Sequence, residues 1–139
     1  LPITDERMTR FWISLEQGVN FVLSSMNMMK GGEIFVPKIS SMKVIDIAKC
    51  MKPDAEYEII GIRPGEKLHE VLITEDDGRS AYELEDRYII ESSLNQATLD
   101  EGIHENTSKV KDCFYYDSKS NKDWVKNDEF IKFLGLLAK

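Results

Sequence analysis

The first regular pattern in the sequence is an apolar stripe at helical spacing between residues 15 and 29. Side chains three, four or seven residues apart fall on one face of a helix, and Gly31-Gly32 ends the pattern. Residues 14–17 (SLEQ) have the form of a capping box, in which serine and glutamine side chains satisfy free amides of a helix start. We therefore predict a helix over 15–29, whose methionines at 26, 28 and 29 fill a core or form a packing surface. The stripe consists of Leu15, Val19, Val22 or Leu23, and Met26.

Short apolar runs bounded by turn residues predict three strands. They are EIFVP (33–37), which ends at proline, EYEIIGI (56–62) and RYIIES (87–92). A second helix is expected after Ser40 or Ser41, because serine hydroxyls suit the cap position of a helix. Its apolar side chains share one face: Val44, Ile47, Ala48 and Met51.

The remaining segments carry weaker patterns. We expect a short helix running into an extended segment over 66–73, and a turn at 75–78. Residues 93–126 are polar and predict an irregular surface excursion. The chain closes with an amphipathic helix over 127–139, which Asn127 or Asp128 caps. Its apolar face is formed by Phe130, Phe133, Leu134 and Leu137. Short strands alternating with helices predict a mixed α/β fold that is too small for a full doubly wound sheet.

Length and composition fit one soluble globular domain. The chain has 139 residues, of which 42% are hydrophobic and 31% charged. No apolar run approaches the roughly 18 residues of a membrane span. The sequence opens Leu1-Pro2-Ile3 without methionine, which indicates a piece of a longer protein; a processed N-terminus is the alternative. We expect one domain over 1–139, with its motifs in 1–92.

The charge distribution narrows the choice of ligand. The net charge of −7 argues against nucleic acid or an anionic membrane as a partner. Residues 1–70 hold 9 basic against 10 acidic side chains, whereas 71–139 hold 9 against 15. An anionic ligand therefore belongs in the first half of the chain.

The cysteines and histidines do not form a recognisable metal site. Cys50 and Cys113 lie far apart, and His69 and His104 do not complete a set of four closely spaced zinc ligands. We expect no metal, reduced thiols and a cytoplasmic protein. We interpret His69 as a residue on a helix face rather than as a general base.

The stretch RPGE (63–66) combines a tight turn with two opposite charges. Proline followed by glycine is what the centre of a type II turn requires, so Arg63 and Glu66 are expected at the two ends of a rigid frame. An arginine fork pairs with phosphate or carboxylate, and a carboxylate accepts hydrogen bonds from sugar hydroxyls. The residues leave two interpretations open: a site for a phosphate beside a hydroxylated ring, or an Arg–Glu surface pair that contributes little.

Two other motifs carry candidate chemistry. In RMTR (7–10), Arg7 and Arg10 are three residues apart; either they provide a second anion contact, or one is solvated and the other pairs with a nearby acid. Tyr115 and Lys119 match the Tyr-x-x-x-Lys pattern of short-chain dehydrogenases. That chemistry needs one helical face and a glycine-rich cofactor turn, and the sequence around YYDSK predicts a loop. We predict no catalytic residue in this chain.

Three long segments together resemble a known family. They are LPITDERMTRFWISLEQGVNFVL (1–23), GGEIFVPKISSMKVIDIAK (31–49) and IIGIRPGEKLHEVLI (59–73). They resemble the C-terminal part of UDP-N-acetylglucosamine 4,6-dehydratases, in particular the inverting type of pseudaminic acid synthesis, a branch of the CapD-like polysaccharide biosynthesis proteins. The resemblance is dense over 1–73 and weak after about 92. Ser40 departs from it, since the family is expected to have proline there.

The resemblance implies an extended short-chain dehydrogenase/reductase. In that family an N-terminal Rossmann domain binds NADP, and a smaller C-terminal domain helps to enclose the nucleotide sugar; this chain resembles the smaller, mixed α+β, substrate-binding domain without the Rossmann half. Carried over by motif, Arg10, Arg63 and Glu66 are expected to contact the UDP-sugar. The parent enzyme is expected to be a lyase and a homo-oligomer. It would oxidise C4 transiently, remove water across C5–C6 and return the hydride to C6 with inversion at C5, giving a UDP-4-keto-6-deoxy sugar.

A different class of function stays open at this point. The same residues would suit a non-catalytic nucleotide-sugar-binding or interaction domain of a regulatory or assembly protein. A glycine-rich turn and a Tyr-x-x-x-Lys helix upstream of Leu1 would distinguish the enzyme from this alternative. In either case the isolated chain is expected to be inactive as a dehydratase.

Overall fold

The computed structural model describes residues 1–92 and 107–133, which form a mixture of helices and short strands. The predicted α/β class is therefore confirmed. The chain divides into two compact units that alternate along the sequence. Unit 1 contains residues 1–14, 39–70 and 117–139, and unit 2 contains residues 15–38 and 71–116.

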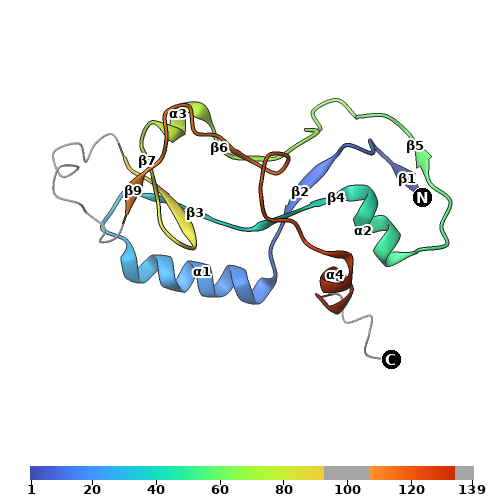
Figure 1. The fold of residues 1–139 in the computed structure, drawn as a ribbon, viewed down its shortest axis with the longest axis horizontal. Coiled ribbons are helices and arrows are strands. Elements are labelled where there is room, and N and C mark those ends of the chain that lie inside the picture. The colour runs from blue at the N-terminus through green and yellow to red at the C-terminus, as the bar shows by residue number, and fades with distance from the viewer. Residues whose placement is uncertain (93–106, 134–139) are drawn as a thin grey trace. The chain divides into compact units, whose positions relative to one another are not determined.

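Unit 1 is built on two small strand pairs and two helices (Figure 1). Strand β1 (Pro2–Ile3) pairs in parallel with β5 (Glu58–Ile59), and β2 (Thr9–Trp12) pairs antiparallel with β4 (Ser40–Lys43). Helices α2 (Val44–Met51) and α4 (Asn127–Phe133) contact one another. The core of the unit consists of Met42, Cys50 and Phe130, with Trp12, Ile47, Val125 and Ile131 packed around them.

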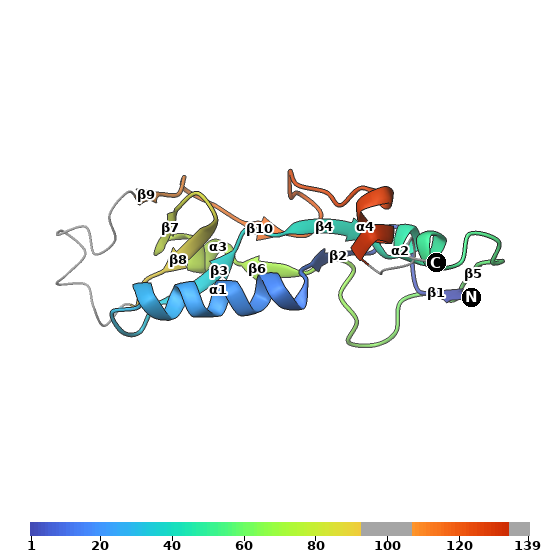
Figure 2. The ribbon, with the colours of Figure 1, turned by 90° about the horizontal axis from the view of Figure 1, so that it is seen from below.

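Unit 2 is a four-stranded sheet with a long helix. The strand order is β3-β8-β7-β9, from β3 (Ile34–Pro37), β8 (Arg87–Ile90), β7 (Ala81–Glu83) and β9 (Ser108–Lys109), and these neighbouring strands pair antiparallel. Helix α1 (Leu15–Met28) lies alongside β3 in both views (Figures 1 and 2). Strand β6 (Val71–Ile73) pairs with β10 (Tyr116–Asp117), and α3 (Glu75–Gly78) is a single capped turn. Every residue of β8 is buried, as expected for a central strand.

A buried arginine attaches α1 to the sheet of unit 2. Arg87 of β8 is 4% exposed and donates to the hydroxyls of Ser24 and Ser25 on α1, at 2.7 and 2.8 Å. Its guanidinium also lies 4.7 Å from the centre of the Phe21 ring and forms two bonds with Asp86, at 2.9 and 2.6 Å. The side of α1 that faces the sheet is therefore held largely by polar contacts.

Several predicted elements are confirmed. The first helix ends one residue before the predicted limit, and the runs at 33–37 and 87–92 contain β3 and β8. Phe130 is fully buried, as predicted for the last helix. Leu134, Leu137 and the first part of the excursion over 93–126 lie outside the described residues.

Other predictions were wrong. Ser40 and Ser41 do not cap the second helix: they lie in β4, and the cap position is Lys43 without a side-chain bond. The run at 56–62 contributes only the two residues of β5. Residues 75–78 form α3, which the Thr74 capping box begins, rather than a plain turn.

The described part of the expected excursion, residues 107–126, is mostly exposed and irregular, but it contains two short strand segments and a few buried side chains. Strand β9 pairs with β7, and Tyr116 and Ser118 are buried, at 7% and 0% exposure. Further on, the Ser41 amide donates to the Asp123 carbonyl and the Val125 amide donates to the Ser41 carbonyl, both at 2.9 Å. Residues 107–126 therefore form a largely exposed segment that strand pairing and backbone hydrogen bonds attach to the rest of the chain at several points.

Candidate functional site

The RPGE stretch forms the predicted turn. Gly65 has a φ of 85°, and the Glu66 amide donates to the Arg63 carbonyl at 3.0 Å. A positive φ at the third position together with this bond is what a type II turn requires, and glycine adopts that φ without the steric cost of a Cβ. The turn prediction is confirmed.

The two charged ends of the turn do not pair with one another. The Glu66 carboxylate accepts a hydrogen bond from the Arg63 backbone amide at 3.0 Å, so it closes the turn on itself. In residues 1–92 and 107–133 no ion pair or hydrogen bond involves the Arg63 guanidinium, and the residue is exposed. The described residues therefore contain no side-chain pair between Arg63 and Glu66, which the surface-pair interpretation requires. The turn presents an arginine fork on a backbone that glycine and Glu66 fix.

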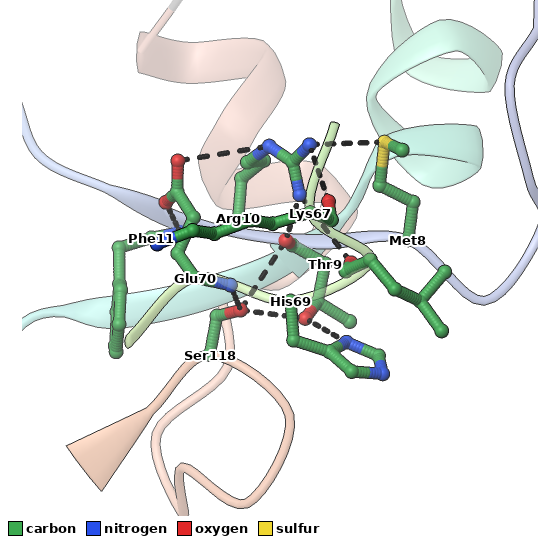
Figure 3. A network of polar contacts seen from close by, with 9 residues as sticks. Met8, Thr9, Arg10, Phe11, Lys67, His69, Glu70 and Ser118 are labelled. Carbon is green, nitrogen blue, oxygen red and sulfur yellow. Dashed lines mark hydrogen bonds and ion pairs between the residues drawn. The ribbon is translucent and has the colours of Figure 1, made fainter. Parts of the chain in front are cut away.

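Arg10 lies against the segment that follows the turn (Figure 3). Its Nη1 donates to the carbonyls of Thr9 (2.7 Å) and Leu68 (3.3 Å), and its Nη2 donates to the Lys67 carbonyl at 3.0 Å. Nη2 also lies 3.2 Å from the Met8 sulfur, and Nε lies 3.6 Å from Glu70 Oε1. All three nitrogens of the guanidinium are therefore engaged. Arg10 thus links β2 to residues 67–70.

A buried chain of hydroxyls supports the same segment from the other side of β2 (Figure 3). Thr9 Oγ1 lies 2.6 Å from Ser118 Oγ and 2.8 Å from His69 Nδ1. Ser118 Oγ accepts from the Glu70 amide at 2.9 Å, and the Ser118 amide donates to the Glu70 carbonyl at 2.9 Å. Thr9 and Ser118 are 3% and 0% exposed. These bonds join β2, residues 69–70 and residue 118 into one polar network.

This network corrects the expected helix at 66–70. The carbonyls of Lys67, Leu68 and Glu70 accept from Arg10, from the Thr9 amide and from the Ser118 amide rather than from a following helical turn. Residues 66–70 are irregular, and only Val71–Ile73 are extended. His69 is therefore not a residue on a helix face.

Burial lowers the pKa of His69 below its usual value, and the positive charge of Lys119 adds to this effect. A lower pKa favours the neutral imidazole near pH 7. Through Nδ1, this ring forms one end of the hydroxyl chain.

Arg7, the other arginine of RMTR, has a local partner. Its Nη2 and Nε contact the Asp5 carboxylate at 2.7 and 3.0 Å. The hydrogen bonds from Arg7 lower the pKa of Asp5 to about 2. One arginine of the motif therefore pairs with a neighbouring acid, as one of the two interpretations held, but the other is engaged rather than solvated.

The remaining candidates form no site in the described part of the chain. Within YYDSK, residues 116–117 form β10, so Tyr115 and Lys119 do not share a helical face. The described residues contain no group of three His, Cys, Asp or Glu side chains placed to hold a metal ion. None of the described helices is long and apolar enough to cross a membrane.

Of the predicted site residues, the structure gives Arg63 and Glu66 a common turn and places Arg10 against residues 67–68, which follow it. No bond joins Arg10 to either of them among the described residues. Thr9 and Ser118 are functional candidates that the sequence did not predict. No local signal identifies them, because a threonine in a strand and a serine in a polar run are common, and their role depends on segments 109 residues apart.

Comparisons with known proteins identify the family of this chain. Residues 1–92 match the family model described as "Polysaccharide biosynthesis protein". The chain is 49% identical, over 96% of its length, to UDP-N-acetylglucosamine 4,6-dehydratase (inverting) of Campylobacter jejuni subsp. jejuni serotype O:2. It is 30% identical, over 79% of its length, to UDP-glucose 4-epimerase of Rickettsia canadensis. The X-ray structure of Pen from Bacillus thuringiensis aligns with a TM-score of 0.79 and 29% identity, covering 99% of this chain and 41% of that one.

The chain spans only part of these relatives. It covers 42% of the Campylobacter dehydratase and 38% of the Rickettsia epimerase. The family match covers the segments that form the turn, Arg10 and residues 67–70. The chain therefore belongs to the polysaccharide biosynthesis protein family.

Proposed function

We propose that this chain is the C-terminal, UDP-sugar-binding portion of a nucleotide-sugar 4,6-dehydratase. The parent enzyme would convert UDP-N-acetylglucosamine to a UDP-4-keto-6-deoxy sugar by loss of water, with inversion at C5. The observation that carries this proposal is the Arg63 guanidinium, which is exposed on a fixed turn without a partner among the described residues. The 49% identity to an inverting dehydratase supports the choice of substrate and stereochemistry.

Each part of the turn has a distinct role in this proposal. The Arg63 fork would form bidentate, charge-assisted hydrogen bonds with the diphosphate. One carboxylate oxygen of Glu66 holds the Arg63 amide, and the remaining lone pairs can accept from a sugar hydroxyl. A turn that is already rigid loses little conformational entropy when the ligand binds, which favours affinity.

Arg10 would act on the ligand in one of two ways. A direct contact with the UDP-sugar, which the resemblance implies, would require Arg10 to exchange at least one of its present bonds. Support of residues 67–70 requires no change, because those bonds already exist. We therefore assign the direct diphosphate contact to Arg63 and the support of the following segment to Arg10.

The residues present do not fit an NADP site. A dinucleotide pyrophosphate is held by a glycine-rich turn between a strand and a helix, and the sequence has no G-x-x-G-x-x-G run. We propose that polypeptide outside this chain binds NADP and carries the catalytic residues, so that the 139 residues alone do not turn over substrate. We further propose that the parent enzyme is a cytoplasmic homo-oligomer and that its product is used in pseudaminic acid or surface polysaccharide synthesis.

Titration of UDP into the full-length enzyme by calorimetry tests the role of Arg63. A hydrogen bond to a charged group contributes about 1.5–3 kcal/mol, so Arg63→Ala should lower UDP affinity roughly ten- to a hundredfold. Arg63→Lys should recover part of the loss, because a point charge does not reproduce the fork. Glu66→Gln should cost less than Arg63→Ala, since an amide oxygen still accepts a hydrogen bond.

The matched control is Arg79→Ala. Arg79 is also exposed, at 80% of its side chain, and pairs with Asp76 in unit 2. The Arg79→Ala substitution should leave both the UDP affinity and the folding of the enzyme unchanged. An unaltered affinity in Arg63→Ala would refute the proposed anion site and leave the turn as a connector.

A further inference from the structure

Helix α1 exposes an apolar face that the described residues of its own unit leave uncovered. The face consists of Leu15, Val19, Val22, Leu23 and Met26, whose exposures are 86%, 49%, 56%, 55% and 60%. At about 100° per residue, these five side chains fall within an arc of roughly 100°. They form one continuous stripe along the helix, where a surface helix normally presents charged and polar groups.

The composition of α1 strengthens this observation. Its sequence, LEQGVNFVLSSMNM, contains a single ionisable side chain, Glu16, in a protein of which 31% of the residues are charged. Scattered exposed apolar residues are normal in soluble proteins, but a contiguous stripe on an almost uncharged helix marks an interaction surface.

The helix cannot bury this face against its own unit by rotation. Its opposite side is already held by the bonds of Ser24 and Ser25 to Arg87 and by the Phe21 ring beneath the guanidinium. Turning α1 would leave the buried Arg87 without those partners, and a buried charge that loses its partners is costly. The apolar face therefore points outward as a fixed feature of the fold.

We propose that the apolar face of α1 is the docking surface for the remainder of the longer enzyme, within the same polypeptide. This inference rests on the proposed function in one respect: it takes the chain to be part of a longer enzyme. The support is length, because the chain spans 42% of the Campylobacter dehydratase and 41% of the Pen chain. More than half of such a polypeptide lies elsewhere and can provide the complementary apolar layer.

Cysteine labelling measures directly whether the face is covered. Met26→Cys is placed on the stripe and Asn27→Cys beside it, outside the stripe; both are made in a Cys113→Ser background, since Cys113 is exposed and Cys50 buried. Labelling by a soluble maleimide is followed by peptide mass spectrometry. We expect position 26 to react at least tenfold more slowly in the full-length enzyme than in the 139-residue chain, whereas position 27 changes by less than twofold.

A charge on the stripe provides an independent measurement. Val22→Asp should lower the melting temperature of the full-length enzyme but not that of the 139-residue chain, and Asn20→Asp should lower neither. Neither measurement depends on UDP binding. A failure of the proposed anion site at Arg63 can therefore be distinguished from a failure of the proposed docking surface.

Three results would overturn the inference. Equal labelling of position 26 in both proteins would mean that nothing covers the stripe. Protection in the 139-residue chain that increases with its concentration would mean that a second copy covers it. Protection of that chain only after addition of phospholipid vesicles would mean that the surface binds lipid.

Discussion

Replacement of Arg10 by alanine separates a supporting role from direct ligand contact. The change removes the bonds to the carbonyls of Thr9, Lys67 and Leu68, and it releases Glu70. The two shortest bonds, at 2.7 and 3.0 Å, would each contribute about 1.5–3 kcal/mol if fully shielded from water. The Arg10 side chain is 27% exposed, and the freed carbonyls can bind water, so we expect a total loss of about 2 kcal/mol.

Urea denaturation of the 139-residue chain measures this loss through tryptophan fluorescence. Both tryptophans, Trp12 and Trp124, belong to unit 1, so their signal reports the unit that contains Arg10. Arg10→Lys should recover less than half of the loss. The planar guanidinium donates to several carbonyls at once, whereas the compact ammonium group of lysine cannot reach all of them.

The UDP titration completes the test of Arg10. If Arg10 supports residues 67–70, then Arg10→Ala should weaken UDP binding by less than Arg63→Ala, and the weakening should follow the loss of stability. An Arg10→Ala enzyme of unchanged stability that loses as much affinity as Arg63→Ala would refute this reasoning and make Arg10 a direct ligand.

Two further changes test the buried polar contacts of each unit. Ser118→Ala leaves the Glu70 amide without its acceptor inside the protein, so we expect a loss of about 2 kcal/mol in urea denaturation, against less than about 0.5 kcal/mol for the exposed control Lys122→Ala. In unit 2, the hydrogen bond from Arg87 lowers the pKa of Asp86. The carboxylate therefore stabilises the fold above its unfolded pKa of about 3.9, and this contribution is lost as the pH falls through the lower folded pKa. The stability difference between the wild-type chain and Asp86→Asn should shrink as the pH falls below about 5; a difference that stays constant would contradict this assignment.

Local sequence predicted those elements whose conformation local residues determine. The RPGE turn follows from the fixed φ of Pro64 and the positive φ that Gly65 allows. Helix α1 and strand β8 follow from apolar spacing and from the residues that end each run. The same spacing did not predict which face of α1 packs against the sheet. That face is set by the hydrogen bond from Arg87 to Ser25, two residues that are 62 positions apart in the sequence.

Two of the errors share one physical cause, which is competition from distant hydrogen-bond partners. Ser41 has the chemistry of a helix cap, but its backbone bonds Asp123 and Val125, so it lies in a strand instead. Residues 66–70 have helix-forming side chains, but Arg10 and Ser118 take the backbone groups that a helix would need. The candidate site was therefore predictable in its exposed arginine and not in its supporting network.

The alternation of the two units along the sequence has a consequence for how the chain folds. Unit 1 combines residues 1–14 with residues 39–70 and 117–139, so its core cannot close until Phe130 has been synthesised. Contacts between residues so far apart slow folding, because the intervening chain must be ordered first. Until then, the early strands have unpaired edges and exposed apolar side chains. Partly folded chains with these features are prone to aggregate. Removal of helix α4 would therefore open the core of unit 1, because Phe130 packs there with Met42 and Cys50, which lie about 80 residues earlier in the chain.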